Sequence, residues 1–272
     1  MRWTERIHAW HRIWRYRLRT ERDELAFLLA QDLAGAIVLD IGANRGIYSY
    51  WLHRAVGSNG HVIAFEPQPE LATYLRDFRQ DFGLHRLTIV ETGLSSRTGT
   101  AQFVRPKTHW GGGSLVTTPN ETHDVFPVPI TTLDEHFANS SLRPIRFIKC
   151  DVENHELEVF RGGSRLLSED RPVLLFETRD HSREPGHVLA TLQELGYDGF
   201  FLSQRGLMPI DQLPEWREKL PKHVRRVSFL NYVFQPSDKR GASRKQIPIS
   251  SGHAPAGFSR RIWMTPWDSR FA

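Results

Sequence analysis

The sequence predicts an α/β protein whose core is a doubly wound, Rossmann-like sheet of seven strands, mostly parallel, with an antiparallel hairpin at one edge. Three observations favour this class. Short apolar runs rich in Val, Ile and Leu alternate with amphipathic stretches of helical period. Five of the runs are followed by an acidic residue. The last two runs, residues 198–203 and 229–235, are joined by a loop with one short helix and can pair antiparallel.

The first apolar run ends in Asp40 and leads into a glycine-containing turn. Gly42 and Gly46 allow a tight turn and let a ligand approach the backbone. Asn44 is expected to cap the helix that follows, over about residues 45–56. A strand, a glycine turn and a helix form a nucleotide site at the carboxyl end of such sheets.

The glycine spacing narrows the choice of ligand. Dinucleotide oxidoreductases use Gly-x-Gly-x-x-Gly to bring backbone amides onto a pyrophosphate. Here the pattern is Asp-x-Gly-x-x-x-Gly, and the first glycine of that fingerprint is absent. A nicotinamide oxidoreductase is therefore disfavoured. A carboxylate at the turn suits a ligand that carries an ammonium group, a description that S-adenosylmethionine fits.

The next two strands add further ligand-binding candidates. Residues 61–65 predict a second strand, followed by Glu66, which lies 26 residues after Asp40. An acid at this place in a nucleotide-binding βαβ unit accepts hydrogen bonds from the ribose hydroxyls. Residues 87–90 predict a third strand, which leads into a turn containing Gly93 where an adenine could be held.

Residues 99–125 interrupt the alternation of strands and helices. Residues 99–104 predict a short hairpin arm, and the polar stretch 106–125 contains three consecutive glycines at 111–113. Such a stretch suits a loop that closes over a substrate. A disordered insertion is the alternative.

A fourth strand over residues 144–150 and a fifth over residues 172–176 each precede an acid. The ionisable candidates at these strand ends are Asp151, Glu153, His155, Glu156 and Glu177. They fall at the carboxyl edge of the sheet, where ligands bind. His155 has the most suitable unperturbed pKa for a base, although a single His in a turn is as often structural. Asp151, Glu153 and Glu177 could instead hold a divalent cation, and the sequence does not decide between these roles.

The charge is unevenly distributed along the chain. Residues 1–22 hold seven Arg against two Glu, net +5, and residues 237–272 hold seven Lys or Arg against two Asp, again +5. Since the whole chain is +5, residues 23–236 carry −5. The basic excess therefore does not indicate a nucleic-acid partner for the fold itself. We expect a basic, Trp-rich helical extension over 1–34, a main domain over 35–236 and a basic, disordered tail over 237–272.

Residues 2–32 predict a helix in which Trp3, Ile7, Trp10 and Trp14 recur on one face. This stripe either packs on the body or forms a basic, Trp-rich surface for anionic lipid or a partner. The single cysteine, Cys150, allows no intrachain disulfide, and no apolar run approaches the roughly 18 residues of a membrane span. The expected location is cytoplasmic, with peripheral contact at the inner membrane surface through the basic ends as an option.

Several short motifs together resemble the FkbM family of class I methyltransferases, over about residues 35–236. The matching stretches are 40–46 (Asp-Ile-Gly-Ala-Asn-Arg-Gly), 65–67 (Phe-Glu-Pro), 112–115 (Gly-Gly-Ser-Leu), 132–134 (Thr-Leu-Asp), 148–156 (Ile-Lys-Cys-Asp-Val-Glu-Asn-His-Glu), 161–163 (Arg-Gly-Gly), 176–177 (Phe-Glu) and 231–234 (Asn-Tyr-Val-Phe). Two positions depart from the family pattern. Asn154 stands where glycine is usual, and Cys150 replaces a branched aliphatic residue.

The resemblance implies S-adenosylmethionine as cofactor and methyl transfer to an oxygen, often a sugar or glycan hydroxyl. The implied cofactor-binding residues are Asp40, Gly42, Asn44, Gly46, Glu66, Gly93 and Asp151. The implied catalytic residues are Asp151, Glu153, His155 and Glu177, with no resident metal assigned. The acceptor could instead be a lipid-linked or small natural-product hydroxyl, and a non-catalytic scaffold is the alternative outside enzymes.

Overall fold

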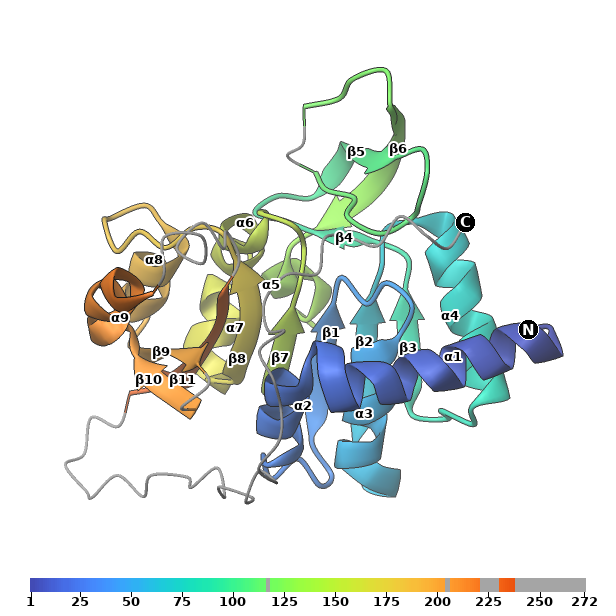
Figure 1. Cartoon of the computed structure of the whole chain (residues 1–272), viewed down its shortest axis with the longest axis horizontal. Coiled ribbons are helices and arrows are strands. Elements are labelled where there is room, and N and C mark those ends of the chain that lie inside the picture. Colours follow the sequence, from blue (N-terminus) through green and yellow to red (C-terminus); the bar gives the residue numbers. More distant parts are fainter. Residues whose placement is uncertain (116–117, 204–205, 221–229, 238–272) are drawn as a thin grey trace.

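The computed structural model describes residues 1–115, 118–203, 206–220 and 230–237, and its centre is one large sheet (Figure 1). The strand order is β10-β9-β11-β8-β7-β1-β2-β3. The strands from β3 to β8 in that order are parallel, and β11 is antiparallel to both β8 and β9. The bounds are β1 (Ile37–Ile41), β2 (His61–Phe65), β3 (Leu87–Val90), β7 (Ile145–Cys150), β8 (Val173–Thr178), β9 (Tyr197–Ser203), β10 (Gly206–Pro209) and β11 (Leu230–Pro236).

The predicted class is confirmed, but the large sheet has eight described strands where seven were expected. Seven of them follow the expected elements, including the antiparallel edge pair β9 and β11. The additional strand, β10, pairs antiparallel with β9 where a loop was expected. It is four residues long, begins with Gly and ends with Pro, so it shows no strand signal in the sequence.

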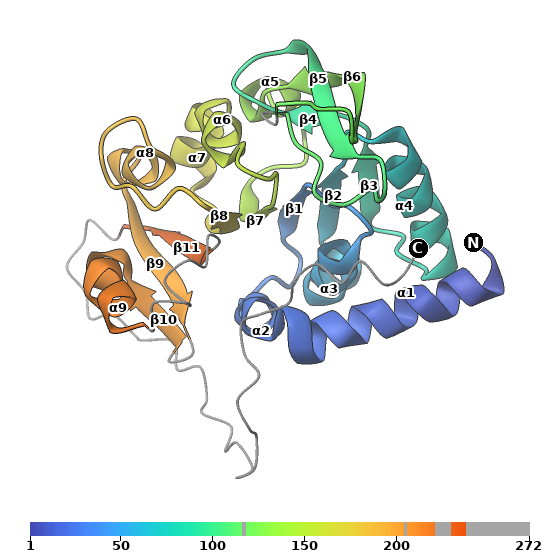
Figure 2. The same cartoon turned by 45° about the horizontal axis from the view of Figure 1, so that its top comes forward.

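Helices cover both faces of the sheet (Figure 2). One hydrophobic core joins α1, α2, α3 (Ile47–Val56) and α4 (Pro69–Asp81) to one face of the strands. The other core joins the opposite face to α5 (Leu133–His136), α6 (Glu156–Arg161), α7 (Ser164–Asp170), α8 (Val188–Glu194) and α9 (Leu213–Lys219). Neighbouring residues of β1 show the division, since Val38 belongs to the first core and Leu39 to the second.

The N-terminal segment is helical as predicted, but it is not one helix. It consists of α1 (Trp3–Arg15), a π-helical turn over Tyr16–Thr20 and α2 (Arg22–Leu29). The helical path breaks at Glu21, whose φ of −129° lies outside the helical range. Leu25 and Leu28 of α2 are buried in the same core as β1 and α3. The boundary at residue 34 stays a prediction, although the first core extends across it.

A small second sheet lies beyond the carboxyl ends of the central strands (Figure 1). It consists of β4 (Gly93–Leu94), β6 (His123–Thr131) and β5 (Gly99–Pro106), in that order. β5 and β6 form the expected hairpin arm, which is longer than predicted. The expected turn around Gly93 is instead the short strand β4, because its backbone pairs with β6.

Two expectations concern the ends of the chain and membranes. Of the predicted disordered tail, all but Ser237 lies outside the described residues. Within the described part of the chain, no helix is long and apolar enough to cross a membrane.

Candidate active site

The glycine turn at the end of β1 is built from three left-handed residues. Gly42, Asn44 and Gly46 have φ values of 76°, 49° and 76°. The prediction that Asn44 caps the helix is wrong, because α3 begins at Ile47 and its N-cap is Gly46. The backbone N–H of Asn44 instead donates to Oε2 of Glu66, at 2.8 Å. The turn is thereby tied to the end of β2.

Two of the glycines are required by close packing. A Cβ on Gly42 would lie 1.9 Å from the carbonyl oxygen of Asp151, and one on Gly46 would lie 2.8 Å from Cδ2 of Leu75. Both distances are below any real Cβ contact, so each glycine lets a second element reach the turn. The predicted close approach of a ligand to Gly42 and Gly46 stays a prediction.

Asp40 lies within β1 and is 2% exposed. Its carboxylate accepts a hydrogen bond from the Ser49 hydroxyl in α3. Burial raises the pKa of Asp40 to about 6. The carboxylate thus links the strand to the helix beneath the turn, and its contact with a ligand ammonium group stays a prediction.

Glu66 is 3% exposed and lies at the start of the loop after β2. Its Oε2 accepts from the Asn44 N–H at 2.8 Å and its Oε1 from the Gln68 N–H at 3.0 Å. Burial raises the pKa of Glu66 to about 7. A side-chain hydrogen bond from Gln68 also acts on this carboxylate, and the predicted contact of Glu66 with ribose hydroxyls stays a prediction. Gly93 is buried nearby, where a Cβ would lie 3.6 Å from Cβ of Pro67.

The end of β7 carries a buried ammonium group. Lys149 is 1% exposed, and its Nζ lies 3.5 Å from Oδ2 of Asp151 and 4.8 Å from the centre of the Tyr48 ring. Burial alone would lower the pKa of Lys149. The charges of Asp151, Glu21 and Glu177 outweigh burial and raise it. Lys149 therefore stays protonated at neutral pH. We call Lys149 and the acids Asp151, Glu21 and Glu177 the Lys149 cluster.

The carboxylates of the Lys149 cluster outnumber its ammonium group. Burial, and next the charge of Asp151, raise the pKa of Glu177 to about 8. The same two causes raise the pKa of Glu153, a half-buried residue with φ of 53°. The structure thus brings three of the four predicted catalytic residues, Asp151, Glu153 and Glu177, into one electrostatically coupled group.

His155, the fourth predicted catalytic residue, is grouped differently. It is 7% exposed, and its Nε2 lies 3.0 Å from the Ser95 hydroxyl. Burial lowers its pKa. The ring thus pairs with Ser95 beside β4 and not with Asp151. Glu156 is also buried at the start of α6, where its Oε1 accepts from the Asn154 N–H at 3.0 Å. A catalytic role for His155 stays a prediction.

Sequence reasoning missed the part of the Lys149 cluster that comes from the N-terminal segment. Glu21 is close enough to raise the pKa of Lys149, and burial raises its own pKa to about 7. Glu24 is 7% exposed and accepts from the Asn231 side chain at 2.8 Å, across the ends of α2 and β11. Lys149 itself was detectable as a charged residue in an otherwise apolar strand. Nothing local in the sequence marks Glu21 or Glu24.

The alternative of a divalent cation has little support. Among the described residues, no group of three or more His, Cys, Asp or Glu side chains is arranged to hold a metal ion. Lys149 already lies between the acids that were considered as ligands, and an ammonium group there opposes a second cation.

The β5–β6 arm is held over the site from two sides. On one side, the Ser114 hydroxyl donates to the carbonyl oxygen of Glu153 at 2.7 Å. On the other, the guanidinium of Arg105 donates to both carboxylate oxygens of Glu70 in α4, at 2.9 and 3.0 Å. The Gln68 side chain also donates to the Trp110 carbonyl at 3.2 Å. The arm therefore covers the region between Glu66 and Glu153.

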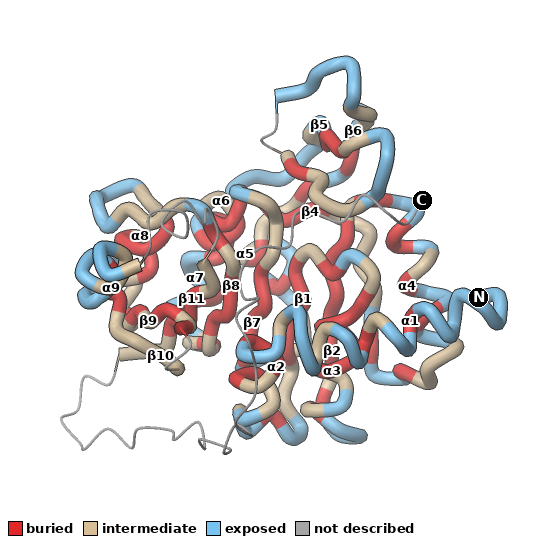
Figure 3. Tube along the Cα trace, viewed as in Figure 1, coloured by how far each residue is buried: buried red, intermediate tan, exposed pale blue. Residues whose placement is uncertain are grey.

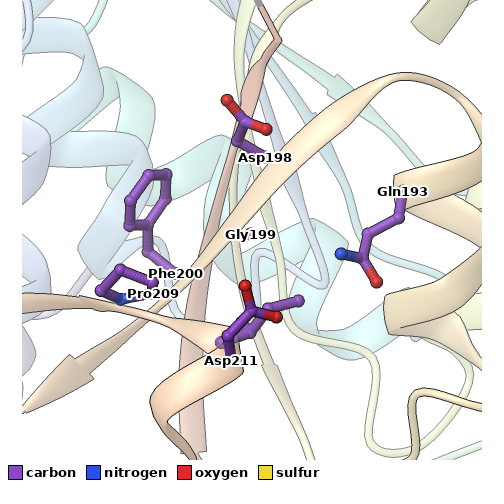
Figure 4. Close-up of a pocket in the computed structure, with 7 residues that line it drawn as sticks. Gln193, Asp198, Gly199, Phe200, Pro209 and Asp211 are labelled. Atoms are coloured by element: carbon purple, nitrogen blue, oxygen red, sulfur yellow. The ribbon is translucent and has the colours of Figure 1, made fainter. Parts of the chain in front are cut away.

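A pocket lies away from the glycine turn, at the β9–β10 edge of the sheet (Figure 4). Its lining comes from α8, β9 and the turn after β10, and includes Gln193, Asp198 and Asp211. Asp211 pairs with Arg183 at 2.6 Å, and Asp198 accepts from the Ser237 hydroxyl at 2.9 Å. Three strands separate β9 from β1 in the sheet, so this pocket has no part in the site described above.

The order of the strands and the glycine turn facing an acidic cluster define a class I methyltransferase. A second observation identifies the family. The family model described as "Methyltransferase FkbM domain" matches residues 40–198. The chain belongs to this family.

Two relatives and one solved structure are similar to the chain. "Hexuronic acid methyltransferase AglP" of Haloferax volcanii is 27% identical over 162 residues, 59% of this chain and 64% of that protein. "Methyltransferase sdnD" of Sordaria araneosa is 26% identical over 59% of this chain and 73% of that protein. The chain thus spans less than two thirds of the length of AglP. The crystal structure of methyltransferase FkbM from Methylobacillus flagellatus KT superposes with a TM-score of 0.45 and 15% identity, covering 74% of this chain and 44% of that one.

Gly42→Ala is expected to destabilise the protein far more than Gly35→Ala. Both glycines have φ above 70°, but only Gly42 faces a backbone oxygen, whereas nothing lies within 4 Å of a Cβ on Gly35. The left-handed conformation alone costs roughly 1–2 kcal/mol. We therefore expect a loss of about that size for Gly35→Ala and at least about 3 kcal/mol for Gly42→Ala, measured by urea unfolding. Equal losses of unfolding free energy in the two variants would show that the close contact with Asp151 adds nothing to the cost of a side chain at position 42.

Arg105→Ala is expected to release the arm. Arg105 is buried but Glu70 is 43% exposed, so the pair contributes about 1 kcal/mol, and cleavage by a protease within residues 107–122 should accelerate by roughly fivefold. Arg76→Ala is the matched control, because Arg76 pairs with Glu91 at 2.6 Å while both side chains are exposed. An unchanged cleavage rate in Arg105→Ala would contradict the role of Arg105 in holding the arm.

Proposed function

We propose that the protein transfers the methyl group of S-adenosylmethionine to a hydroxyl oxygen of a sugar or glycan. The observation that carries the proposal is the Lys149 cluster, in which ionisable carboxylates lie beside the glycine turn of a methyltransferase fold. A related protein named for methylation of a hexuronic acid supports a sugar as acceptor.

The chemistry requires alignment and removal of a proton. S-adenosylmethionine, when bound, supplies an electrophilic methyl group on a sulfonium. The residues of this chain must hold the acceptor oxygen in line with that methyl group and take up the hydroxyl proton. Positioning of this kind contributes up to roughly 7–11 kcal/mol in favourable systems, and a correctly placed base contributes about 100- to 10,000-fold in rate.

Glu177 is the base that we favour. Its pKa is raised to about 8, within about one unit of neutral pH, and a pKa near the working pH is the condition for efficient proton transfer. Lys149 supports the ionised form of Glu177, since its charge lowers the Glu177 pKa. We assign Asp151 and Glu153 to contacts with acceptor and cofactor.

Cofactor binding is assigned to the residues around the glycine turn. We assign Glu66 to the ribose hydroxyls, because its carboxylate lies at the end of β2 and is tied to the glycine turn through the Asn44 N–H. The other assigned residues are Asp40, Gly42, Asn44, Gly46, Gly93 and Asp151. Their backbone conformations and burial support this assignment.

Two alternatives concern the acceptor and the activity. A lipid-linked or small natural-product hydroxyl would use the same base and the same cofactor site. A non-catalytic scaffold would need none of the ionisable groups. The acids and the buried Lys149 favour an enzyme, because buried charged groups cost stability unless they serve a purpose.

Isothermal titration separates an enzyme from a scaffold. The protein is expected to bind S-adenosylmethionine and S-adenosylhomocysteine with micromolar affinity and to show no binding of NADH. Glu66→Ala should weaken both adenosyl ligands by roughly 100-fold, because two hydrogen bonds to a charged group are lost. Glu91→Ala, which removes the acid at the end of the neighbouring strand β3, is the control and should bind normally. Loss of methyl transfer in Glu66→Ala with binding intact would contradict the ribose assignment, and no binding by the unaltered protein would favour the scaffold.

The pH dependence tests Glu177. At pH 7 a group with a pKa near 8 is mostly protonated and cannot accept a proton, so kcat/KM should rise with pH to an apparent pKa of about 8. We propose to measure S-adenosylhomocysteine release with a panel of p-nitrophenyl glycosides and glucuronides. Glu177→Gln should lower kcat/KM by roughly 100-fold or more and abolish this rise. Glu21→Gln should move the rise to lower pH, because the charge of Glu21 raises the Glu177 pKa.

A second measurement needs no acceptor. The folded pKa of Glu177 lies above its unfolded value, so the folded state binds the additional proton, and its contribution to stability is lost as pH rises through about 8. The free energy of unfolding of the unaltered protein should therefore fall relative to Glu177→Gln between pH 5 and pH 9. A difference that stays constant with pH would show that Glu177 is not buried among like charges.

A further inference from the structure

α1 exposes an apolar stripe along its length. The exposed fractions are 73% for Trp3, 46% for Ile7, 49% for Trp10, 40% for Trp14 and 62% for Leu18 in the following π-helical turn. The residues that α1 buries against the body are instead Ala9 and Ile13. The predicted packing of this helix on the body is thus made mainly by Ala9 and Ile13, with partial cover of Trp10 and Trp14, and much of the Trp stripe stays exposed. Figure 3 shows most of α1 as exposed, and Figure 2 shows α1 along an outer edge of the molecule.

The exposed indoles are held in place from below. Trp10 stacks on Phe82 with ring centres 6.3 Å apart and planes 13° apart, and Trp14 meets Trp51 edge to face at 5.5 Å. These contacts limit the rotation of both indoles. A partner that docks on the stripe therefore costs little side-chain conformational entropy. A contiguous exposed patch of this kind indicates a protein or membrane contact.

Positive charge surrounds the stripe. At 100° per residue, Arg6 lies on one side of the stripe, and His11 and Arg15 lie on the other. The exposed arginines of the segment are Arg2, Arg6, Arg15, Arg19 and Arg22. Residues 1–22 together hold seven Arg against two Glu. An amphipathic helix with Trp and aliphatic residues on one face and arginines around them suits the headgroup region of an anionic bilayer.

Charge and surface chemistry distinguish the candidate binding partners of the exposed stripe on α1. A second copy docked on the same stripe would bring two sets of arginines together, and residues 237–272 of this chain, also +5, would be repelled. A nucleic acid would find no stacking surface on Ile7 or Leu18. We propose that α1 docks the protein on an anionic lipid bilayer, with the stripe Trp3, Ile7, Trp10, Trp14 and Leu18 inserted at the headgroup level.

Co-flotation with vesicles tests the proposal. The full-length protein should float with vesicles of phosphatidylcholine mixed with phosphatidylglycerol, and not with phosphatidylcholine alone. The triple variant Trp3→Ser, Ile7→Ser, Leu18→Ser should lower partitioning by roughly tenfold or more, since it removes exposed apolar area without touching Trp10 or Trp14. Arg6→Gln and Arg15→Gln should each lower it about fivefold and weaken its dependence on salt.

Matched controls separate this surface from general stickiness. Val125→Ser removes an apolar side chain that is 45% exposed on the arm, and Arg54→Gln removes an exposed charge on α3. Neither should change partitioning. Lipids brominated near the headgroup should quench fluorescence of the unaltered protein more than that of Trp3→Phe, which reports the position of Trp3 directly.

The same set of variants identifies the results that overturn the proposal. These are the absence of binding to anionic vesicles, an equal loss of binding in the control variants, and a stripe-dependent dimer seen by light scattering without lipid. Stripe-dependent binding of a single-stranded oligonucleotide without vesicle binding would assign the surface to nucleic acid instead. Because none of these readouts needs methyl transfer, the outcome is independent of the proposed activity.

Discussion

The close contact between Gly42 and the backbone of Asp151 is the constraint on which the site depends. The Asp151 N–H donates to the Ile41 carbonyl at 2.9 Å, and the Asp151 carbonyl fills the space that a side chain on Gly42 would need. The parallel pairing of β1 and β7 leads directly to this contact. The glycine turn and the Lys149 cluster therefore form one unit, and a displacement of either moves the other.

That unit brings several ionisable groups together, and burial shifts their pKa values. Asp40, Glu66 and Glu177 all have raised pKa values because water is excluded, while Lys149 remains protonated among its acidic neighbours. Buried carboxylates destabilise a fold unless something compensates them. The cofactor of the family carries an ammonium and a sulfonium group, and positive charge of this kind compensates an acidic site. The same excess of carboxylates keeps Glu177 near the pKa that a base requires.

Local patterns in the sequence were sufficient for the strands of the large sheet other than β10, for the glycine turn, and for the acids at the ends of β2, β7 and β8, because each is set by neighbours in the chain. Contacts across the fold were not predictable in this way. Glu24 meets Asn231 from 207 residues away, and the charge of Glu21 acts on Lys149 although the two are far apart in the chain. Asn44 has the residue type of a cap, yet its left-handed φ and the bond to Glu66 decide its role. The Trp stripe has helical spacing, but only the packing of Ala9 and Ile13 reveals which face is exposed.

The N-terminal segment contributes both to the Lys149 cluster and to the exposed surface of α1. Its π-helical turn ends at Thr20 and is followed by Glu21, a member of the Lys149 cluster, while α1 leads away from the cluster and carries the exposed stripe. The break at Glu21 separates the part whose charge acts on Lys149 from the part that faces outward. A continuous helix would place Glu21 on the helical path of α1 and could not serve both environments. The irregular turn is therefore the feature that allows one segment to complete the site and to present a surface.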